Sequence, residues 1–324
     1  MLPLVCSMVA AGWLAYYAYS PLQPTQTPLQ FSLKAGSSLK SAAQQMSNAG
    51  VLDDPTHFVV LARLMGQSGN IKAGNYEVEK PITPLKLLRK ITEGDYTQDV
   101  IRLVEGWTFQ QMRKALDDHP AIRHDTTGLG IAEILLRLDI AHSSPEGWFF
   151  PDTYHFSRGS SDLAILRRAH RLMRATLADQ WERRTPGLPL ATPYDALILA
   201  SIIEKETGQA AERRLIAAVF VNRLRMGMKL QTDPSVIYGL GENYGGNLRK
   251  RDLLADTPYN TYLRAGLPPT PIALPGLASL NAALNPAQSD ALYFVSRGDG
   301  TSHFSRTLSE HDRAVTKYQK AGRR

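Results

Sequence analysis

The sequence predicts an α+β protein with an apolar N-terminal helix, a small module and a larger mixed α/β domain built around a buried central helix. Three observations support this fold class. The chain begins with about 20 residues of the kind that cross membranes. Short helix and strand patterns then alternate up to about residue 97, and a segment near residues 194–207 is apolar on nearly every face. At 324 residues the chain can hold more than one structural unit.

The N-terminal segment is free of charge, and the first charged side chain is that of Lys34. Residues 2–19 are nearly all apolar or aromatic, close to the length of about 18–20 residues that a spanning helix needs. Aromatic residues that favour a membrane interface gather at its end, at Trp13, Tyr16, Tyr17 and Tyr19. Prolines follow between residues 21 and 28 and end the helix.

We therefore expect an uncleaved transmembrane anchor at residues 1–20 and a linker at residues 21–30. A cleaved signal peptide is the alternative, although no small-x-small cleavage site follows the apolar stretch and both interpretations lack the usual positive flank. In either case the bulk of the chain is expected to be exported.

Composition narrows the possible partners. The net charge of +7 favours anionic partners, but no basic cluster is combined with an aromatic nucleic-acid signature, so we expect no nucleic acid. Cys6 is the only cysteine, which excludes an intramolecular disulfide. The eight histidines are scattered without HExxH spacing, and we expect neither a metal nor a cofactor.

Residues 31–97 form the predicted small module. Capping residues and periodicity predict helices at Leu39–Met46, Pro55–Met65 and Thr83–Glu93, with a strand ending at Val78. The opening stretch Phe31–Leu39 resembles the start of a peptidoglycan-binding LysM module, in which a strand, a glycine turn and a capped helix follow one another. A small α+β adaptor without that function is the alternative.

Residues 98–324 form the predicted larger domain. Its strands are expected at Val100–Val104 and in a hairpin from Ala291–Ser296 to His303 and Phe304. Its helices are expected at Thr108–Asp118, Ile131–Leu138, Asp162–Arg183, Tyr194–Thr207, Ala211–Arg225 and His311–Lys320.

Two carboxylates lie at the end of the apolar helix. Leu199, Ile202 and Ile203 share a helix face with Glu206, and the opposite face carries Glu204. Burial and the negative end of the helix dipole both favour a protonated carboxyl, which is what a general acid requires. Periodicity does not choose between the two glutamates, and a solvated Glu-Lys-Glu helix end is the alternative. A Ser201–Lys205 nucleophile pair is a further possibility, although S-x-x-K spacing and an oxyanion motif are both absent.

Polar and aromatic side chains then accumulate in the second half of the chain. Together they have the composition of a sugar-binding site, where rings stack on sugars and amides bind hydroxyl groups. Capping and turn formation are the alternative roles for the polar members. The polar set is Asn222, Gln231, Thr232, Asp233, Asn260, Thr261 and Tyr262, and the aromatic set is Trp148, Phe149, Tyr154, Tyr238 and Tyr259.

Several segments of the sequence closely resemble the endolytic murein transglycosylases of the YceG-like family. The similarity covers nearly the whole chain after the linker, and the order of anchor, LysM-like module and catalytic domain agrees with it. The segments are Glu146–Tyr154, Ala200–Thr207, Val219–Gly227, Leu230–Gly239, Tyr259–Tyr262, Gly266–Pro269 and Pro271–Gly276.

The resemblance implies a bacterial inner-membrane enzyme whose catalytic domain, residues 98–324, faces the periplasm. It would cut nascent peptidoglycan strands between N-acetylmuramic acid and N-acetylglucosamine without hydrolysis, leaving 1,6-anhydro ends. The family motif assigns catalysis to the second glutamate, Glu206, acting first as acid and then as base. The residues hypothesised to bind or orient the glycan are Gln231, Asp233, Tyr238, Asn260, Tyr262, Asn222, Glu146 and Asp152.

Two other functions stay open from the sequence. The chain could be a membrane-tethered peptidoglycan-binding scaffold without catalysis. It could also be a muramidase-type hydrolase, which would need a second carboxylate such as Asp233. Besides peptidoglycan glycan strands, glycan-polymerising synthases at the membrane are plausible partners.

Overall fold

The computed structural model describes residues 12–25, 28–78, 81–95 and 98–320. Within these residues the chain divides into two compact units. Unit 1 comprises the residues up to Val100 together with His155–Ser160, and unit 2 comprises Ile101–Tyr154 and the residues from Ser161 onward. The chain passes between the units within a strand pair, β3 (Gln98–Arg102) and β5 (Thr153–Ser157).

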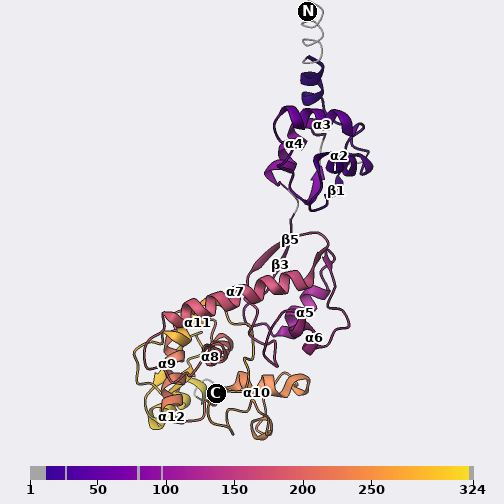
Figure 1. The fold of residues 1–324 in the computed structure, drawn as a ribbon. Coiled ribbons are helices and arrows are strands. Elements are labelled where there is room, and N and C mark those ends of the chain that lie inside the picture. The colour runs from indigo at the N-terminus through magenta and orange to yellow at the C-terminus, as the bar shows by residue number, and fades with distance from the viewer. Residues whose placement is uncertain (1–11, 26–27, 79–80, 96–97, 321–324) are drawn as a thin grey trace, which may run out of the picture. The chain divides into compact units, whose positions relative to one another are not determined.

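Unit 1 is built on a β-α-α-β arrangement (Figure 1). The antiparallel strands β1 (Leu29–Leu33) and β2 (Gly74–Val78) pair with Leu29 opposite Val78. Between them lie α2 (Leu39–Asn48) and α3 (Pro55–Leu64), and α4 (Pro84–Glu93) follows. This confirms the predicted helices.

The helix boundaries of unit 1 follow the local chemistry of the chain. The side chains of Ser38, Asp54 and Thr83 accept hydrogen bonds from the first turns of α2, α3 and α4. Gly94 ends α4 in the left-handed conformation, with φ of 82°.

The N-terminal helix and the segment after it belong to unit 1. Ala18, Leu22 and Leu29 are buried in the same apolar cluster as the helices, and the backbone N–H of Leu22 donates to the carbonyl of Ile82. Of the predicted anchor, residues 1–11 lie outside the described residues. In the part of the chain that is described, no helix is both long and apolar enough to cross a membrane.

Unit 2 is a mixed α/β arrangement around one helix, α8 (Pro193–Glu206). Residues 196–203 of α8 are all buried, and α8 packs against α7 (Asp162–Glu182), α9 (Arg213–Arg225), α10 (Asp233–Leu240) and α11 (Leu277–Leu284). The prediction of a buried central helix is thus confirmed. A reciprocal capping box between Thr192 and Asp195, with Pro193 in the first turn, fixes where α8 begins.

The other elements of unit 2 are short. Strand β4 (Ile122–Arg123) pairs with β6 (Ser160–Ser161), and β7 (Tyr293–Ser296) forms the predicted hairpin with β8 (Ser302–Ser305). The remaining helices and helical turns are α5 (Phe109–Asp117), α6 (Ile131–Arg137), η1 (Gly241–Asn243), η2 (Asp252–Leu254), α12 (Leu308–Val315) and η3 (Thr316–Lys320).

Three helices differ most from the sequence prediction. Helix α12 begins three residues earlier than expected, because Thr307 and Glu310 form a capping box. Asp233 and Pro234, for which a turn was the alternative, are the first two residues of helix α10. The helix can begin there because Thr232 is its N-cap and proline is tolerated in a first turn. Helix α11 was not anticipated, although it is one of the helices that enclose α8.

Gly147 offers a stability test, because it has φ of +79° and its α-carbon faces α8 and the loop at Pro271. A Cβ there would lie 2.7 Å from two carbons of Pro271, whereas a Cβ at Gly128, with φ of +77°, would meet no atom within 4 Å. Both alanine variants suffer backbone strain, but only Gly147→Ala adds a clash. We expect Gly147→Ala to lose about 1–3 kcal/mol more unfolding free energy than Gly128→Ala in urea titrations. Equal losses would contradict the packing described here.

Candidate active site

Glu206 is the last residue of α8, a helix whose residues 196–203 are all buried. Its Oε1 accepts a hydrogen bond from the Thr232 hydroxyl group, and among the described residues this is the hydrogen bond that the carboxyl makes. Burial raises the pKa of Glu206 to about 7, and the neighbouring charge of Asp233 acts in the same direction. With a pKa of about 7 the carboxyl is about half protonated near neutral pH, and the residue as a whole is partly accessible.

Glu204 has a different environment, which separates the two glutamates that periodicity left equivalent. Its side chain is 6% exposed, its Oε2 accepts a hydrogen bond of 2.9 Å from the N–H of Gly276, and its Oε1 lies 3.7 Å from the Arg213 guanidinium group. Glu204 therefore joins α8 to the start of α11 and to α9. Both of its oxygens are engaged in holding the fold.

The alternative Ser201–Lys205 pair is not assembled. The Ser201 hydroxyl donates to the carbonyl of Ile198 at 2.7 Å and accepts from the N–H of Ile272 at 3.0 Å. Lys205 donates to the carbonyl of Gly106. The serine is fully buried and both its hydrogen-bonding roles are taken, which argues against a nucleophile.

The N-terminus of α10 brings predicted site residues to Glu206. Thr232 is the N-cap of α10 and Asp233 its first residue. The Tyr262 hydroxyl donates to Asp233 Oδ1 at 2.5 Å, and burial together with this bond raises the pKa of Tyr262 well above its usual value. Asp233, whose charge helps to raise the pKa of Glu206, is thus held at the start of α10.

A buried arginine that the sequence analysis did not select holds the loop before α10. The Arg223 guanidinium group donates to the carbonyls of Lys229 at 3.1 Å, Leu230 at 2.9 Å and Leu292 at 2.7 Å. It also donates to Gln231 Oε1 at 3.2 Å, and Gln231 has φ of +52°, a conformation that is strained for a residue with a side chain. Arg223 therefore positions the loop that delivers Thr232 and Asp233.

The two predicted amides, Asn222 and Asn260, are engaged with backbone groups. Asn222 Nδ2 donates to the carbonyls of Ser289 and Ala291. Asn260 is fully buried, and its Nδ2 donates to the carbonyls of Leu253 and Ala255. Its Oδ1 accepts from the N–H of Tyr262, so Asn260 sets the position of the tyrosine that bonds Asp233.

Glu146 and Tyr238 form a second polar contact of unit 2. Glu146 is 4% exposed; its Oε1 accepts from the N–H of Phe109 at 2.9 Å, and its Oε2 accepts from the Tyr238 hydroxyl at 3.1 Å. Burial raises the pKa of Glu146 to about 7. Tyr238 lies on α10, and Thr232 is the N-cap of the same helix. The hydrogen-bond partners of Glu146 and Glu206, the two carboxyl groups whose pKa values are raised, are therefore both placed by α10. Asp152 is exposed and accepts from its neighbour Thr153, and no contact joins it to Glu206 among the described residues.

The aromatic residues expected to stack on sugars divide into two groups. Trp148, Phe149 and Tyr154 are buried and belong to the core. Tyr238 and Tyr259 are partly exposed, with their rings 4.9 Å apart and edge to face. Of these five residues, only Tyr238 and Tyr259 keep a substantial accessible surface.

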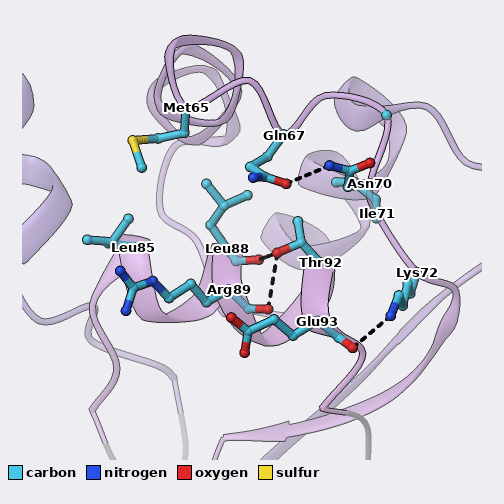
Figure 2. Close-up of a pocket in the computed structure, with 11 residues that line it drawn as sticks. Met65, Gln67, Asn70, Ile71, Lys72, Leu85, Leu88, Arg89, Thr92 and Glu93 are labelled. Atoms are coloured by element: carbon cyan, nitrogen blue, oxygen red, sulfur yellow. Dashed lines mark hydrogen bonds between the residues drawn. The ribbon is translucent and has the colours of Figure 1, made fainter.

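Two other features could bind small ligands. Asp117, His124 and Asp162 bring one potential ligand atom each within 4.8 Å of one another, but the Asp162 oxygens already accept from Asp125, Thr126 and Leu163. In unit 1 a pocket of about 610 Å³ lies between the loop after α3 and the helix α4 (Figure 2). Its lining contains none of the predicted site residues.

Comparison with known proteins identifies the group to which this fold and site belong. The chain is a member of the YceG-like family, which it matches over residues 31–317. A Bacillus subtilis (strain 168) protein named endolytic murein transglycosylase is 31% identical, and the match covers 95% of this chain and 90% of the relative. A protein of the same name from Streptococcus pneumoniae (strain D39) is 25% identical over 96% of this chain, which spans 63% of that relative's length.

A solved structure agrees with this membership. The crystal structure of a YceG-like protein from Listeria monocytogenes matches with a TM-score of 0.56 and 29% sequence identity. The match covers 88% of this chain and 98% of that one.

The structural role of Arg223 can be tested by comparing two arginines of α9. Lysine cannot reproduce the planar fork that reaches four acceptors, so Arg223→Lys should lower the unfolding free energy by about 2–3 kcal/mol. Arg225 is exposed and contacts only the carbonyl of Gly187 among the described residues, so Arg225→Lys should change it by less than about 0.5 kcal/mol. Urea denaturation followed by tryptophan fluorescence measures both. Similar values for the two variants would refute a special role for Arg223.

Proposed function

We propose that the protein is an endolytic lytic transglycosylase that cleaves peptidoglycan between N-acetylmuramic acid and N-acetylglucosamine. The observation that carries the proposal is the carboxyl of Glu206, whose pKa is raised to about 7 and which is held beside Thr232 and Asp233. The name shared by the relatives from Bacillus and Streptococcus supports the substrate and the reaction class.

In the first step Glu206 acts as an acid. Its proton passes to the glycosidic oxygen as the bond between that oxygen and C1 of the muramic acid breaks. The departing sugar leaves with a hydroxyl group, and positive charge develops on the muramic ring. Because protonation near neutral pH requires a carboxylic acid with a raised pKa, the burial of Glu206 serves this step directly.

In the second step the same group acts as a base. The Glu206 carboxylate removes the proton from the C6 hydroxyl of the muramic acid, whose oxygen forms a bond to C1. The product has a 1,6-anhydro ring, Glu206 regains its proton, and no water is consumed. The reaction therefore needs a single acid-base residue, and the acceptor benefits from being part of the same molecule.

Asp233 is the neighbour that supports both steps. As an anion held by Tyr262 it stabilises the positive charge of the transition state and helps to keep Glu206 protonated. We assign Gln231 and Tyr238 to glycan binding, because both keep accessible surface on either end of α10. Arg223, Asn222 and Asn260 act indirectly, by holding the loops in place.

A hydrolase is the second candidate, and the position of Asp233 is the observation that favours it. A carboxylate beside the acid could activate water, which would produce reducing muramic ends. Digestion in water enriched in ¹⁸O separates the two reactions, because only hydrolysis transfers the heavy oxygen to the product.

The proposed cellular setting follows from the N-terminal sequence. The apolar N-terminal segment would anchor the chain in the inner membrane, with both units in the periplasm. The β-α-α-β arrangement of unit 1 supports a LysM-like module that holds glycan strands near the membrane. Synthases that polymerise the strands are the partners that such a position favours.

Substitution of the two neighbouring glutamates tests the assignment of the acid. Glu206→Gln keeps the shape of the side chain but cannot donate or accept the proton, so the rate should fall about 10²–10⁴-fold. Glu204→Gln should keep most of the activity with a lower melting temperature, since Glu204 holds the start of α11. Mass spectrometry of the glycan ends measures both. An active Glu206→Gln with an inactive Glu204→Gln would reverse the assignment.

The pH dependence of the rate gives a separate test. Because the acid must be protonated, the rate should fall about tenfold per pH unit above pH 7, the raised pKa of Glu206. Initial rates measured between pH 5 and 9 show this fall, which is the alkaline limb of the pH profile. Glu146 also has a pKa raised to about 7, so the matched control is Glu146→Gln, in which the limb should persist. Loss of the limb in that variant would assign the acid to Glu146.

A further inference from the structure

The N-terminal helix is fixed to unit 1. Its residues Leu14, Tyr17 and Ala18 pack into the same apolar cluster as the core of the unit. The Trp13 ring lies 4.5 Å from the ring of His57 on α3, and the Tyr17 ring lies 5.6 Å from it. The start of this helix therefore has a fixed position relative to α3.

Helix α3 exposes an apolar stripe next to that contact. His57, Val60 and Leu64 are spaced by three and four residues, so they share one helix face, and Met65 follows. Val60 is 40% exposed, Leu64 68% and Met65 50%, which is unusual for one short stretch of helix. We call these four residues the α3 face. Figure 1 shows the N-terminal helix standing on unit 1 at α3.

The aromatic residues of the N-terminal helix add to this surface. Trp13, Tyr16 and Tyr19 are exposed and lie on the sides of the helix that do not enter the core. Their combination of an apolar ring and a polar edge suits the boundary between lipid and water. The sequence before them, residues 1–11, has no charged side chain.

We propose that the α3 face lies on the lipid surface of the membrane that holds the N-terminus of the chain. The proposal rests on the proposed membrane anchor and adds that unit 1 itself contacts lipid in a fixed orientation. Helix α3 itself has no acidic residue, and the carboxylate of its N-cap, Asp54, lies 3.5 Å from His57 Nδ1. Arg63 beside Leu64 suits the phosphate groups of lipid headgroups. The charge-free N-terminal sequence, the exposed aromatic residues Trp13, Tyr16 and Tyr19, and the α3 face follow one another. This continuity points to a bilayer as the occupant of the α3 face.

Fluorescent labels in the full chain test the contact. In a Cys6→Ser background, single cysteines replace Leu64 or Val60 on the α3 face, Lys40 on the exposed side of α2, or Val9 in the N-terminal segment. Each is labelled with an environment-sensitive dye and reconstituted in vesicles of phosphatidylethanolamine and phosphatidylglycerol. Lipids that carry a quencher just below the headgroups then report contact with the bilayer. Circular dichroism verifies that each variant is folded.

We expect the labels at Leu64 and Val60 to shift to shorter wavelength and to be quenched by the lipids, and the label at Lys40 to behave as in water. The proposal would be overturned if the label at Val9 is quenched but the labels at Leu64 and Val60 behave like the label at Lys40. That result would leave the proposed anchor intact. A label at Val9 that stays in water would remove the anchor and the proposal together. A blue shift at Leu64 without lipid quenching would indicate a protein contact and also overturn it.

Discussion

The burial of residues 196–203 of α8 on every face is the constraint on which the rest of unit 2 depends. A helix with apolar side chains on all faces has no stable position at a surface, so other helices must enclose it. Glu206 lies less than one turn beyond eight consecutive buried residues, 196–203, and burial against that core raises the pKa of its carboxyl. The raised pKa therefore results from the same packing that stabilises the fold, and the site and the core cannot be altered independently.

Helix α10 links this core to the polar residues of the site. Its first turn provides Thr232 and Asp233 beside Glu206, and its last turn provides Tyr238, which bonds Glu146. Two carboxyl groups with raised pKa values are thus connected through one helix of eight residues. Arg223 fixes the loop that leads into it, which explains how Gln231 is held in a strained backbone conformation.

Much of this could be predicted from the sequence, and the remainder depends on contacts between distant segments. Caps and periodicity located α8, and the family motif selected Glu206. Periodicity alone could not separate Glu204 from Glu206, because the difference lies in their partners, Gly276 and Thr232, which are far away in the chain. Trp148 was expected to face a sugar but is buried, since composition does not report which ring surfaces remain accessible. The short helices α10 and α11 were missed because each spans about two turns, too few for a clear period.

The central claim is that burial keeps the Glu206 carboxyl protonated near neutral pH. It is measured most directly by ¹³C NMR titration of the glutamate side-chain carboxyls in the full chain, with the Glu206 signal assigned by its disappearance in Glu206→Gln. We expect an apparent pKa of about 7 for that signal. A pKa near the ordinary value of about 4.3 would contradict it, because the carboxyl would then be ionised where the acid step needs its proton.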